Sequence, residues 1–355
     1  MSKIMLYRLQ LFAILVVLST LIGALEGYLA GVSDAADAAD AADAATIMYH
    51  HGITWFIGSS LIWGFEILFV SSRFGESIRR LYFLTAIALK SVVLVLIVVL
   101  AGLLGHALLH NSYDISFLIE PHSFRTLFFV FAAIILIQTV LQIVRIIGGR
   151  TLIYFVLGKY YRPVREEKIF MFLDLVGSTA LAERLGDVGV QTMITRFFFD
   201  IDEPIIEYGG EVHRYVGDQV VVTWPLKAGK DNMRAIQCCF AIARKIRNKA
   251  LEYEREFGIV PSYRIGLHGG PVVISQCGNQ KQEISYFGDT VNTAARIEQQ
   301  CKALDCPLLI SSELLSRITL PESFQIQSKG AVTLSGREKE TELVTIINGK
   351  QVSMA

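Results

Sequence analysis

The sequence predicts an all-α bundle of four transmembrane helices, followed by an α+β domain with a ferredoxin-like βαββαβ order of elements. Three observations support this prediction. Four apolar runs of membrane-spanning length lie within the first 147 residues, and from Lys168 onward short apolar strands alternate with helical periodicity. The 355-residue chain is also 52% apolar with a mean hydropathy of +0.46, which is too apolar for two soluble domains.

The four predicted spans cover residues 9–30, 52–72, 81–105 and 124–147. Each is close to the ~20 residues that a helix needs to cross a bilayer core. Basic residues gather before the first span, between the second and third, and after the fourth: Lys3, Arg8, Arg73, Arg79, Arg80, Arg145, Arg150, Lys159, Arg162 and Arg165. By the positive-inside rule we expect a multi-pass protein of the inner (plasma) membrane, with both termini and the second domain in the cytoplasm.

Two ionisable residues lie inside the predicted spans, Glu66 in the second and Lys90 in the third. Charges within lipid are costly unless they are paired. At the helical rise per residue, Glu66 lies about 10 Å and Lys90 about 14 Å from the inner ends of their helices, so the two side chains can pair. The pair is either structural or part of a signalling or proton-linked site.

Five of the seven histidines are predicted at the outer membrane level: His50, His51, His106, His110 and His122. A bis-histidine haem or a transition-metal site requires neutral imidazoles from facing helices, and His106 and His110 share one helical face. The alternative is a set of interfacial histidines bonded to water or lipid headgroups. A haem or metal held by His50, His51, His106 and His110 is therefore one of two open interpretations.

Charge and cysteine content exclude other classes of protein. The chain has 33 basic and 33 acidic residues, so it offers no basic footprint and we expect no nucleic-acid partner. All five cysteines lie in the second half, in an odd number and without zinc-site spacing. They are typical of free thiols in a reducing compartment, which agrees with a cytoplasmic second domain.

We divide the chain into a membrane anchor or sensor (1–147), a cytoplasmic linker (148–167), a second domain (168–347) and a C-terminal tail (348–355). Strands are predicted at 168–174, 211–216, 219–224, 262–268, 271–275, 308–311 and 341–347. Helices are predicted at 179–200, 231–257 and 289–303. The order strand, helix, hairpin, helix, strand is that of a ferredoxin-like core.

The second domain contains three polar motifs. In the first, an apolar strand ends at Asp174 and leads into a helix start at Ser178, where a carboxylate can hold Mg²⁺ and free N–H groups can bind phosphate. The second is the Gly217-Asp218 turn, which a ferredoxin-like sheet places beside the end of the first strand. The third is Gly288-Asp289-Thr290-Val291-Asn292-Thr293-Ala294-Ala295-Arg296.

Together with the segment Arg264-Ile265-Gly266-Leu267-His268-Gly269-Gly270-Pro271-Val272, these motifs resemble the class III nucleotidyl cyclase catalytic domain, the family that makes cyclic AMP or cyclic GMP. The resemblance covers about residues 165–347. It implies that Asp174 and Asp218, with the Leu175 carbonyl, hold two Mg²⁺ or Mn²⁺ ions per site. It also implies a triphosphate cradle, made by Val176, Gly177, Ser178 and Thr179.

The same resemblance implies roles in catalysis and base recognition. Asn292 would orient the ribose, and Arg296 would stabilise charge on the α-phosphate. Arg214 and Ser285 occupy the base-recognition positions, where adenylyl cyclases usually have Lys and Asp and guanylyl cyclases Glu and Cys. Ser at this position is similar to a subgroup of bacterial adenylyl cyclases. ATP is therefore the expected substrate and GTP the alternative.

The resemblance further implies that Arg337 contacts the triphosphate and that each active site forms between two copies of the chain. This chain carries both sets of residues, so a homodimer is expected. The expected reaction is attack of the ribose 3′-oxygen of ATP on the α-phosphate, in a membrane-bound enzyme regulated through its linker. A different class of protein stays open as an alternative: a haem or metal redox sensor whose cytoplasmic domain only binds nucleotide.

Overall fold

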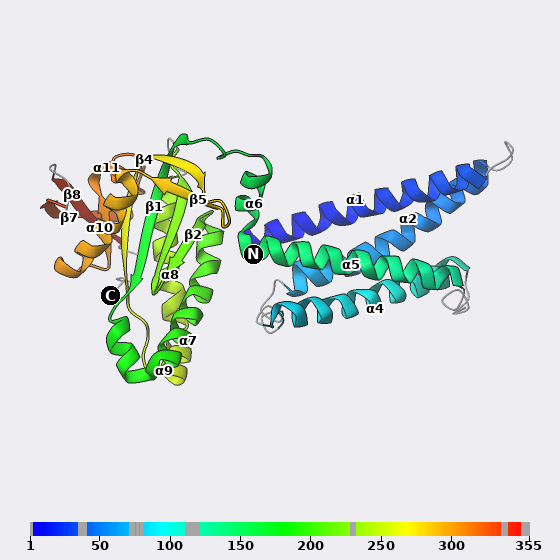
Figure 1. Ribbon diagram of the computed structural model, residues 1–355, viewed down its shortest axis with the longest axis horizontal. Coiled ribbons are helices and arrows are strands. Elements are labelled where there is room, and N and C mark those ends of the chain that lie inside the picture. The colour runs from blue at the N-terminus through cyan, green and yellow to red at the C-terminus, as the bar shows by residue number, and fades with distance from the viewer. Residues whose placement is uncertain are drawn as a thin grey trace. The chain divides into compact units, whose positions relative to one another are not determined.

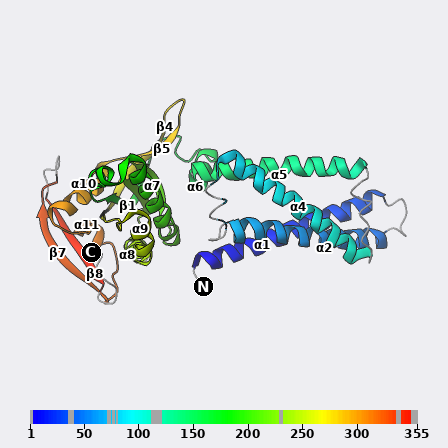
Figure 2. The same cartoon turned by 90° about the horizontal axis from the view of Figure 1, so that it is seen from below.

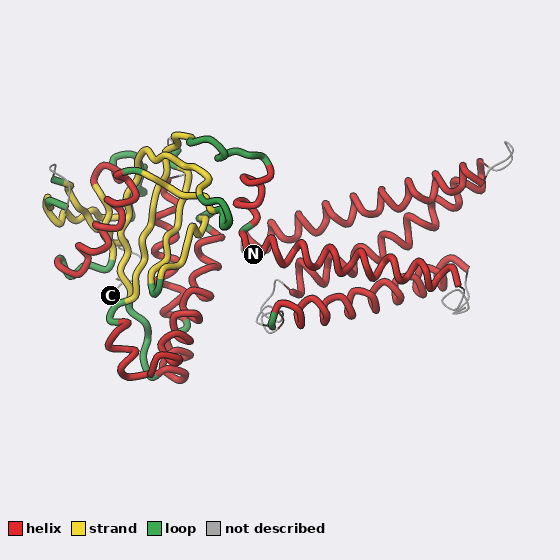
Figure 3. The backbone as a smooth tube through the Cα atoms, in the orientation of Figure 1, coloured by secondary structure: helices red, strands yellow, loops and turns green. Residues whose placement is uncertain are grey.

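The computed structural model describes residues 3–34, 41–70, 75, 78, 81–110, 121–227, 232–334 and 340–348. Contacts between residues divide the chain into two units, 1–153 and 154–355. The first unit is helical, and the second combines a sheet with helices (Figures 1 and 3).

The first unit contains α1 (Lys3–Asp34), α2 (Ala41–Trp63), the π-helix η2 (Gly64–Val70), α4 (Phe83–His110), α5 (Pro121–Ile147) and the start of α6 (Gly149–Val156). Within the described residues, three helices are long and apolar enough to cross a membrane: Arg8–Leu29, Ala45–Val70 and Phe83–Gly105. A fourth span is counted only if the segments Ile134–Val144 and Gly149–Val156, bent by 98°, are taken as one. The fourth predicted span, 124–147, therefore stays a prediction.

The predicted pairing of Glu66 with Lys90 is confirmed. Lys90 Nζ lies 2.5 Å from Glu66 Oε1, and the Lys90 side chain is almost fully buried. Gln138 of α5 completes the cluster: its Oε1 accepts a hydrogen bond from Lys90 at 3.0 Å, and its Nε2 donates to Glu66 at 3.5 Å. One buried polar cluster thus joins η2, α4 and α5, and its acid lies in a π-helical segment, a rare conformation that is frequent at functional sites.

The second unit is built on a mixed sheet. Its strands are β1 (Val164–Leu175), β2 (Glu211–Val216), β3 (Gln219–Pro225), β4 (Tyr263–Cys277), β5 (Glu283–Phe287), β6 (Leu308–Ser311), β7 (Phe324–Val332) and β8 (Thr341–Asn348). The order is β2-β3-β1-β4-β6-β8-β7, and β5 pairs with β4 outside this path. β4 and β6 are parallel, whereas β1 is antiparallel to both of its neighbours, β3 and β4.

The helices of this unit are α7 (Ser178–Glu207), α8 (Met233–Asn248), α9 (Ala250–Phe257), α10 (Asp289–Ala303) and α11 (Ser312–Leu315). Side chains alternate along β1 because successive residues of a strand point to opposite faces. Met171 and Leu173 enter the main core with residues of α7, α8 and α9, whereas Phe170 and Phe172 face the other side. On that second face they contact a smaller apolar cluster that includes Ala294 of α10 and Tyr160.

Several predicted boundaries were wrong. The strands predicted at 262–268 and 271–275 are one strand, β4, because β1 pairs with it without interruption from Tyr263 to Ile274. On the other side of β4, β6 pairs with Ile265–Leu267 and β5 pairs only from Val273 onward. Pro271 lies between the segments that pair with β6 and β5, so its lack of an N–H removes no hydrogen bond to either strand. The helix predicted at 231–257 is two helices that meet at Lys249. β5 and β7 were not predicted, and β4 and β5 form the projecting hairpin of Figure 2.

Candidate active site

The two predicted metal carboxylates lie at the same end of the sheet. Asp174 is the next-to-last residue of β1 and pairs in register with Gln219 of β3. Asp218 directly precedes Gln219, in the β2–β3 turn. Partial burial and the charge of Asp218 raise the pKa of Asp174 to about 6, while Arg264 acts in the opposite direction. The fold thus brings together two acids from positions 44 residues apart in the sequence.

Two further charged residues belong to this cluster and were not predicted. Arg264 of β4 lies opposite Asp174 in the β1–β4 ladder. Glu298 of α10 is buried, and its pKa is raised to about 7 by burial and by the charges of Asp174 and Asp218, against the effect of Arg264. Arg264 belongs to the Arg264–Val272 segment noted in the sequence, but only the strand register shows that it lies opposite Asp174. Glu298 carried no sequence signal.

These residues fit a divalent cation. Carboxylate and carbonyl oxygens are the ligands that Mg²⁺ prefers. Because the charge of Asp218 raises the cost of ionising Asp174, an added positive charge between the two carboxylates is stabilising. The Leu175 side chain is buried in the main core, so only its backbone is available on this side. A cation would be held by Asp174 and Asp218, with the Leu175 carbonyl beside them.

The predicted phosphate cradle is a helix N-terminus. Gly177 precedes α7 with φ of +71°, a conformation that favours glycine, and it has no side chain with which to cap the helix. Ser178 and Thr179 form the first turn of α7, where backbone N–H groups have no partner within the helix. Val176 donates its N–H to the Ser262 carbonyl, which ties this loop to the start of β4. The N–H groups at such a helix end attract anions.

Asn292 and Arg296 occupy one face of α10, four residues apart. Asn292 is exposed and Arg296 half-buried. Among the described residues, Arg296 forms no ion pair with Asp174 or Asp218. One copy of the chain therefore brings the two metal carboxylates together without an ion pair to Arg296.

The two predicted base-recognition residues lie on β2 and β5. Arg214 donates a hydrogen bond to Glu283 at 3.1 Å, and Ser285 follows Glu283 by two residues on β5, so both point to the same side of the strand. The ring of His213 meets the ring of Tyr286 edge-on, with centroids 4.7 Å apart. Burial and the neighbouring Arg214 lower the pKa of His213 to about 4. Glu283 was not predicted, because β5 itself was missed.

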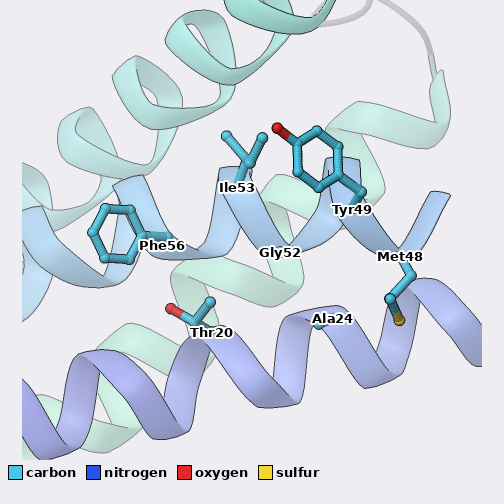
Figure 4. A pocket seen from close by; sticks show the side chains of 7 residues that line it. All are labelled: Thr20, Ala24, Met48, Tyr49, Gly52, Ile53 and Phe56. Carbon is cyan, nitrogen blue, oxygen red and sulfur yellow. The ribbon is translucent and has the colours of Figure 1, made fainter. Parts of the chain in front are cut away.

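Other predicted sites stay predictions. Arg337 and the side chains of His106 and His110 lie outside the described residues. Within the part of the chain that the structure describes, no group of three or more His, Cys, Asp or Glu residues is placed to hold a metal ion. The first unit also has an open cavity of about 360 Å³ between α1 and α2 (Figure 4), lined by Thr20, Ala24, Met48, Tyr49, Gly52, Ile53 and Phe56. Its lining has no charged group.

Comparison with known proteins agrees with the geometry of the second unit. The model of the adenylate and guanylate cyclase catalytic domain matches residues 162–348, more than half of the chain. The chain therefore belongs to the adenylate and guanylate cyclase catalytic domain family, as its motifs indicate.

Individual relatives match over part of their length. Adenylate cyclase 2 of Rhizobium meliloti (strain 1021) is 37% identical over 210 residues, which are 59% of this chain and 58% of that protein. A receptor-type guanylate cyclase of Caenorhabditis elegans is 24% identical over 172 residues, 48% of this chain and 13% of that protein. A bacterial light-regulated adenylyl cyclase shares the fold, with 24% identity, a TM-score of 0.52 and coverage of 62% of this chain and 65% of that chain. The chain thus spans less than two thirds of each of these proteins.

Proposed function

We propose that this protein is a membrane-bound adenylate cyclase that converts ATP to cyclic AMP and pyrophosphate. The observation that carries the proposal is the placement of Asp174 and Asp218 together at the end of β1, beside the N-terminus of α7, in a chain of the cyclase family. The 37% identity to an adenylate cyclase supports ATP as the substrate.

In the proposed reaction the ribose 3′-oxygen attacks the α-phosphorus of ATP. A new bond closes the cyclic phosphodiester, the bond from the α-phosphorus to the bridging oxygen breaks, and pyrophosphate leaves with that oxygen. The hydroxyl proton passes to solvent. When bound, divalent cations supply charge neutralisation for the triphosphate and acidify the ribose hydroxyl.

The residues of β1, the β2–β3 turn and α7 bind the reacting end of the nucleotide. Asp174, Asp218 and the Leu175 carbonyl hold the cations. The backbone from Val176 to Thr179 binds the phosphates, since N–H groups at a helix start favour anions. Arg337, outside the described residues, would add a positive charge to the same triphosphate.

Asn292 orients the ribose and Arg296 stabilises the charge that builds on the α-phosphate in the transition state. Because Arg296 forms no ion pair with Asp174 or Asp218 among the described residues of one copy, we propose that α10 serves the nucleotide held by a second copy. Each homodimer then has two equivalent sites.

Base selection belongs to Arg214 and Ser285 in this proposal. A second candidate function, cyclisation of GTP, is favoured by one observation, the carboxylate of Glu283 next to Arg214. Guanine presents N–H donors that a carboxylate accepts and a carbonyl oxygen that a guanidinium can bind. The hydroxyl of Ser285 suits either base.

The first unit anchors the enzyme in the lipid bilayer. Three apolar helices support this part of the proposal. We further propose a fourth span at 124–147, an inner-membrane location with both termini and the catalytic domain in the cytoplasm, a ferredoxin-like core in the second unit, and regulation of the enzyme by its membrane domain.

The test is nucleotide cyclisation by the detergent-purified full-length protein with Mg²⁺ or Mn²⁺, with ATP and GTP offered separately and Asp174→Ala as the control. We expect cyclic AMP from ATP and no product from the variant. Cyclic GMP as the main product would replace the adenylate assignment with the guanylate one. If neither nucleotide gives product, the cyclase function is wrong.

A further inference from the structure

Helix α10 rests directly on the backbone of β4. Gly266 of β4 lies opposite Phe172 of β1 in the ladder and is buried. A Cβ atom added at Gly266 would lie 2.3 Å from the Glu298 nitrogen, 2.7 Å from the Glu298 Cα and 2.8 Å from the Ala294 carbonyl oxygen. All three atoms are backbone of α10, so no side chain can fit between helix and strand here. A glycine in a strand often marks this kind of backbone approach.

A second contact holds the first turn of the same helix. The hydroxyl of Thr290 donates a hydrogen bond to the Pro271 carbonyl at 2.7 Å. A Cβ atom on Gly270 would lie 2.9 Å from that hydroxyl oxygen. Gly266 and Gly270 are four residues apart in β4 and so clear space on the same face of the sheet. We call the three residues Gly266, Gly270 and Pro271 the α10 seat.

The seat determines where the exposed face of α10 lies. Ala294 and Glu298 are four residues apart and buried toward β4, whereas Asn292 and Arg296 each precede them by two residues. Two residues are about 200° of helical rotation, so Asn292 and Arg296 point away from the sheet. Their distance from the sheet therefore depends on how closely the α10 backbone can approach Gly266.

We propose that Gly266 and Thr290 are positioning residues of the cyclase reaction: they set the depth of α10 and thereby place Asn292 and Arg296 against the nucleotide held by the second copy. This inference rests on the proposed function. It also explains three residues of the Arg264–Val272 segment, Gly266, Gly270 and Pro271, which have no role of their own in the proposed reaction. Neither Gly266 nor Thr290 needs to contact substrate.

The test compares Gly266→Ala with Gly269→Ala in the full-length protein. Gly269 is a buried glycine of the same strand, but a Cβ atom there would meet the flexible end of the Leu314 side chain rather than helix backbone. Gly266→Ala must displace α10 by roughly 1 Å, and a misplacement of this size can cost about 100-fold in rate. We expect kcat to fall on that scale for Gly266→Ala, with kcat close to wild type for Gly269→Ala.

Mixed dimers separate positioning from general damage to the fold. Co-expressed, differently tagged copies allow the purification of dimers that contain one copy of each variant. In a dimer of Gly266→Ala with Asp174→Ala, one site combines intact metal carboxylates with an undisturbed α10, so we expect about half of the wild-type activity to return. In a dimer of Gly266→Ala with Arg296→Ala, both sites have a defective α10, so activity should stay low.

A milder variant covers the case in which Gly266→Ala does not fold. Thr290→Val keeps the side-chain shape but loses the hydrogen bond to Pro271, and it should lower kcat with the same pattern of rescue by Asp174→Ala and not by Arg296→Ala. Thr290→Ser keeps the hydroxyl and should restore kcat. Full activity of Gly266→Ala would overturn the inference alone. The same holds if Asp174→Ala restores activity in mixed dimers with Arg296→Ala but not in mixed dimers with Gly266→Ala. An inactive wild-type protein would overturn the proposed function and the inference with it.

Discussion

The Arg214 guanidinium donates a hydrogen bond to Glu283 Oε1 at 3.1 Å, and this contact joins β2 to β5, two strands that are not neighbours in the sheet. A β-bulge between Val212 and Arg214 shifts the register of β2 against β3 just before the contact. Bulges re-aim side chains beside active sites. The bulge therefore contributes to where Arg214 points, and Glu283 holds it there.

The first prediction concerns base preference. Glu283→Gln keeps the size of the side chain but removes its charge, so Arg214 is held less firmly. We expect the ratio of kcat/KM for ATP to that for GTP to change by roughly two- to fivefold, the scale of an exposed ion pair. Glu322→Gln, a change of the same kind at an exposed position of the chain, should leave the ratio unaltered. An unchanged ratio in Glu283→Gln would show that Glu283 does not take part in base selection.

The second prediction concerns the carboxylate pair. Asp218→Asn should abolish cyclisation and yet stabilise the metal-free protein at pH 7.5. In the folded state the pKa of Asp174 is about 6, above its ordinary value of 3.8. The ionised form of Asp174 therefore destabilises the folded state at every pH above 6. This cost disappears as the pH falls below 3.8. Removing the charge of Asp218 relieves part of it.

Thermal unfolding with excess EDTA checks the second prediction. For a domain of the size of the second unit, a gain of about 1 kcal/mol raises Tm by ~2–4 °C. The matched control is Asp187→Asn, at an exposed position of α7. A lower Tm in Asp218→Asn than in this control would mean that the two carboxylates do not repel each other in the free protein.

The third prediction concerns pH and His213. The pKa of His213 is about 4 in the folded state, below its ordinary 6.5, so the unfolded chain binds more protons between these values. Stability should be independent of this group above pH 6.5 and fall as the pH drops toward 4, by about 3 kcal/mol at most. His213→Phe keeps a ring against Tyr286 but cannot titrate. Denaturant unfolding at pH 7.5 and 5 should therefore show a smaller acid-induced loss in the variant than in wild type.

The fourth prediction concerns the transition state. Arg296→Ala should lower kcat by roughly 10²–10³-fold and change KM for the nucleotide little, because the charge that Arg296 stabilises develops only during reaction. Lys302→Ala, an exposed position at the other end of α10, serves as the control and should keep wild-type kinetics. A rise in KM with kcat unchanged would instead assign Arg296 to substrate binding.

The fifth prediction concerns the membrane unit. Glu66→Leu leaves the buried Lys90 without its counter-charge, and breaking a buried ion pair costs about 3–5 kcal/mol. The double change Glu66→Leu with Lys90→Leu removes both charges and should recover most of that loss. The readout is the thermal stability of the detergent-purified full-length protein. A double variant as unstable as the single one would show that the cluster acts through its hydrogen bonds to Gln138 rather than through the ion pair.

Much of the fold and site could be predicted because the signals are local. Apolar runs located three of the candidate membrane helices, and helical rise placed Glu66 and Lys90 at a common depth. The hairpin of β2 and β3 follows from two apolar runs around Gly217-Asp218, and α10 begins and ends where its periodicity predicts. Each of these features depends on residues within one or two turns of the chain, or on a period that can be counted.

What the sequence by itself determined is the set of candidate site residues: one acid at the end of a strand and one in a turn, a glycine before a helix, and an Asn and an Arg on one helical face. Only the tertiary structure decided which groups meet. Arg264 lies opposite Asp174 through strand register, Glu283 of β5 accepts a hydrogen bond from Arg214 of β2, and Gly266 lets the α10 backbone rest on β4. The physical reason is that these contacts join segments dozens of residues apart, where packing rather than local propensity selects the partner.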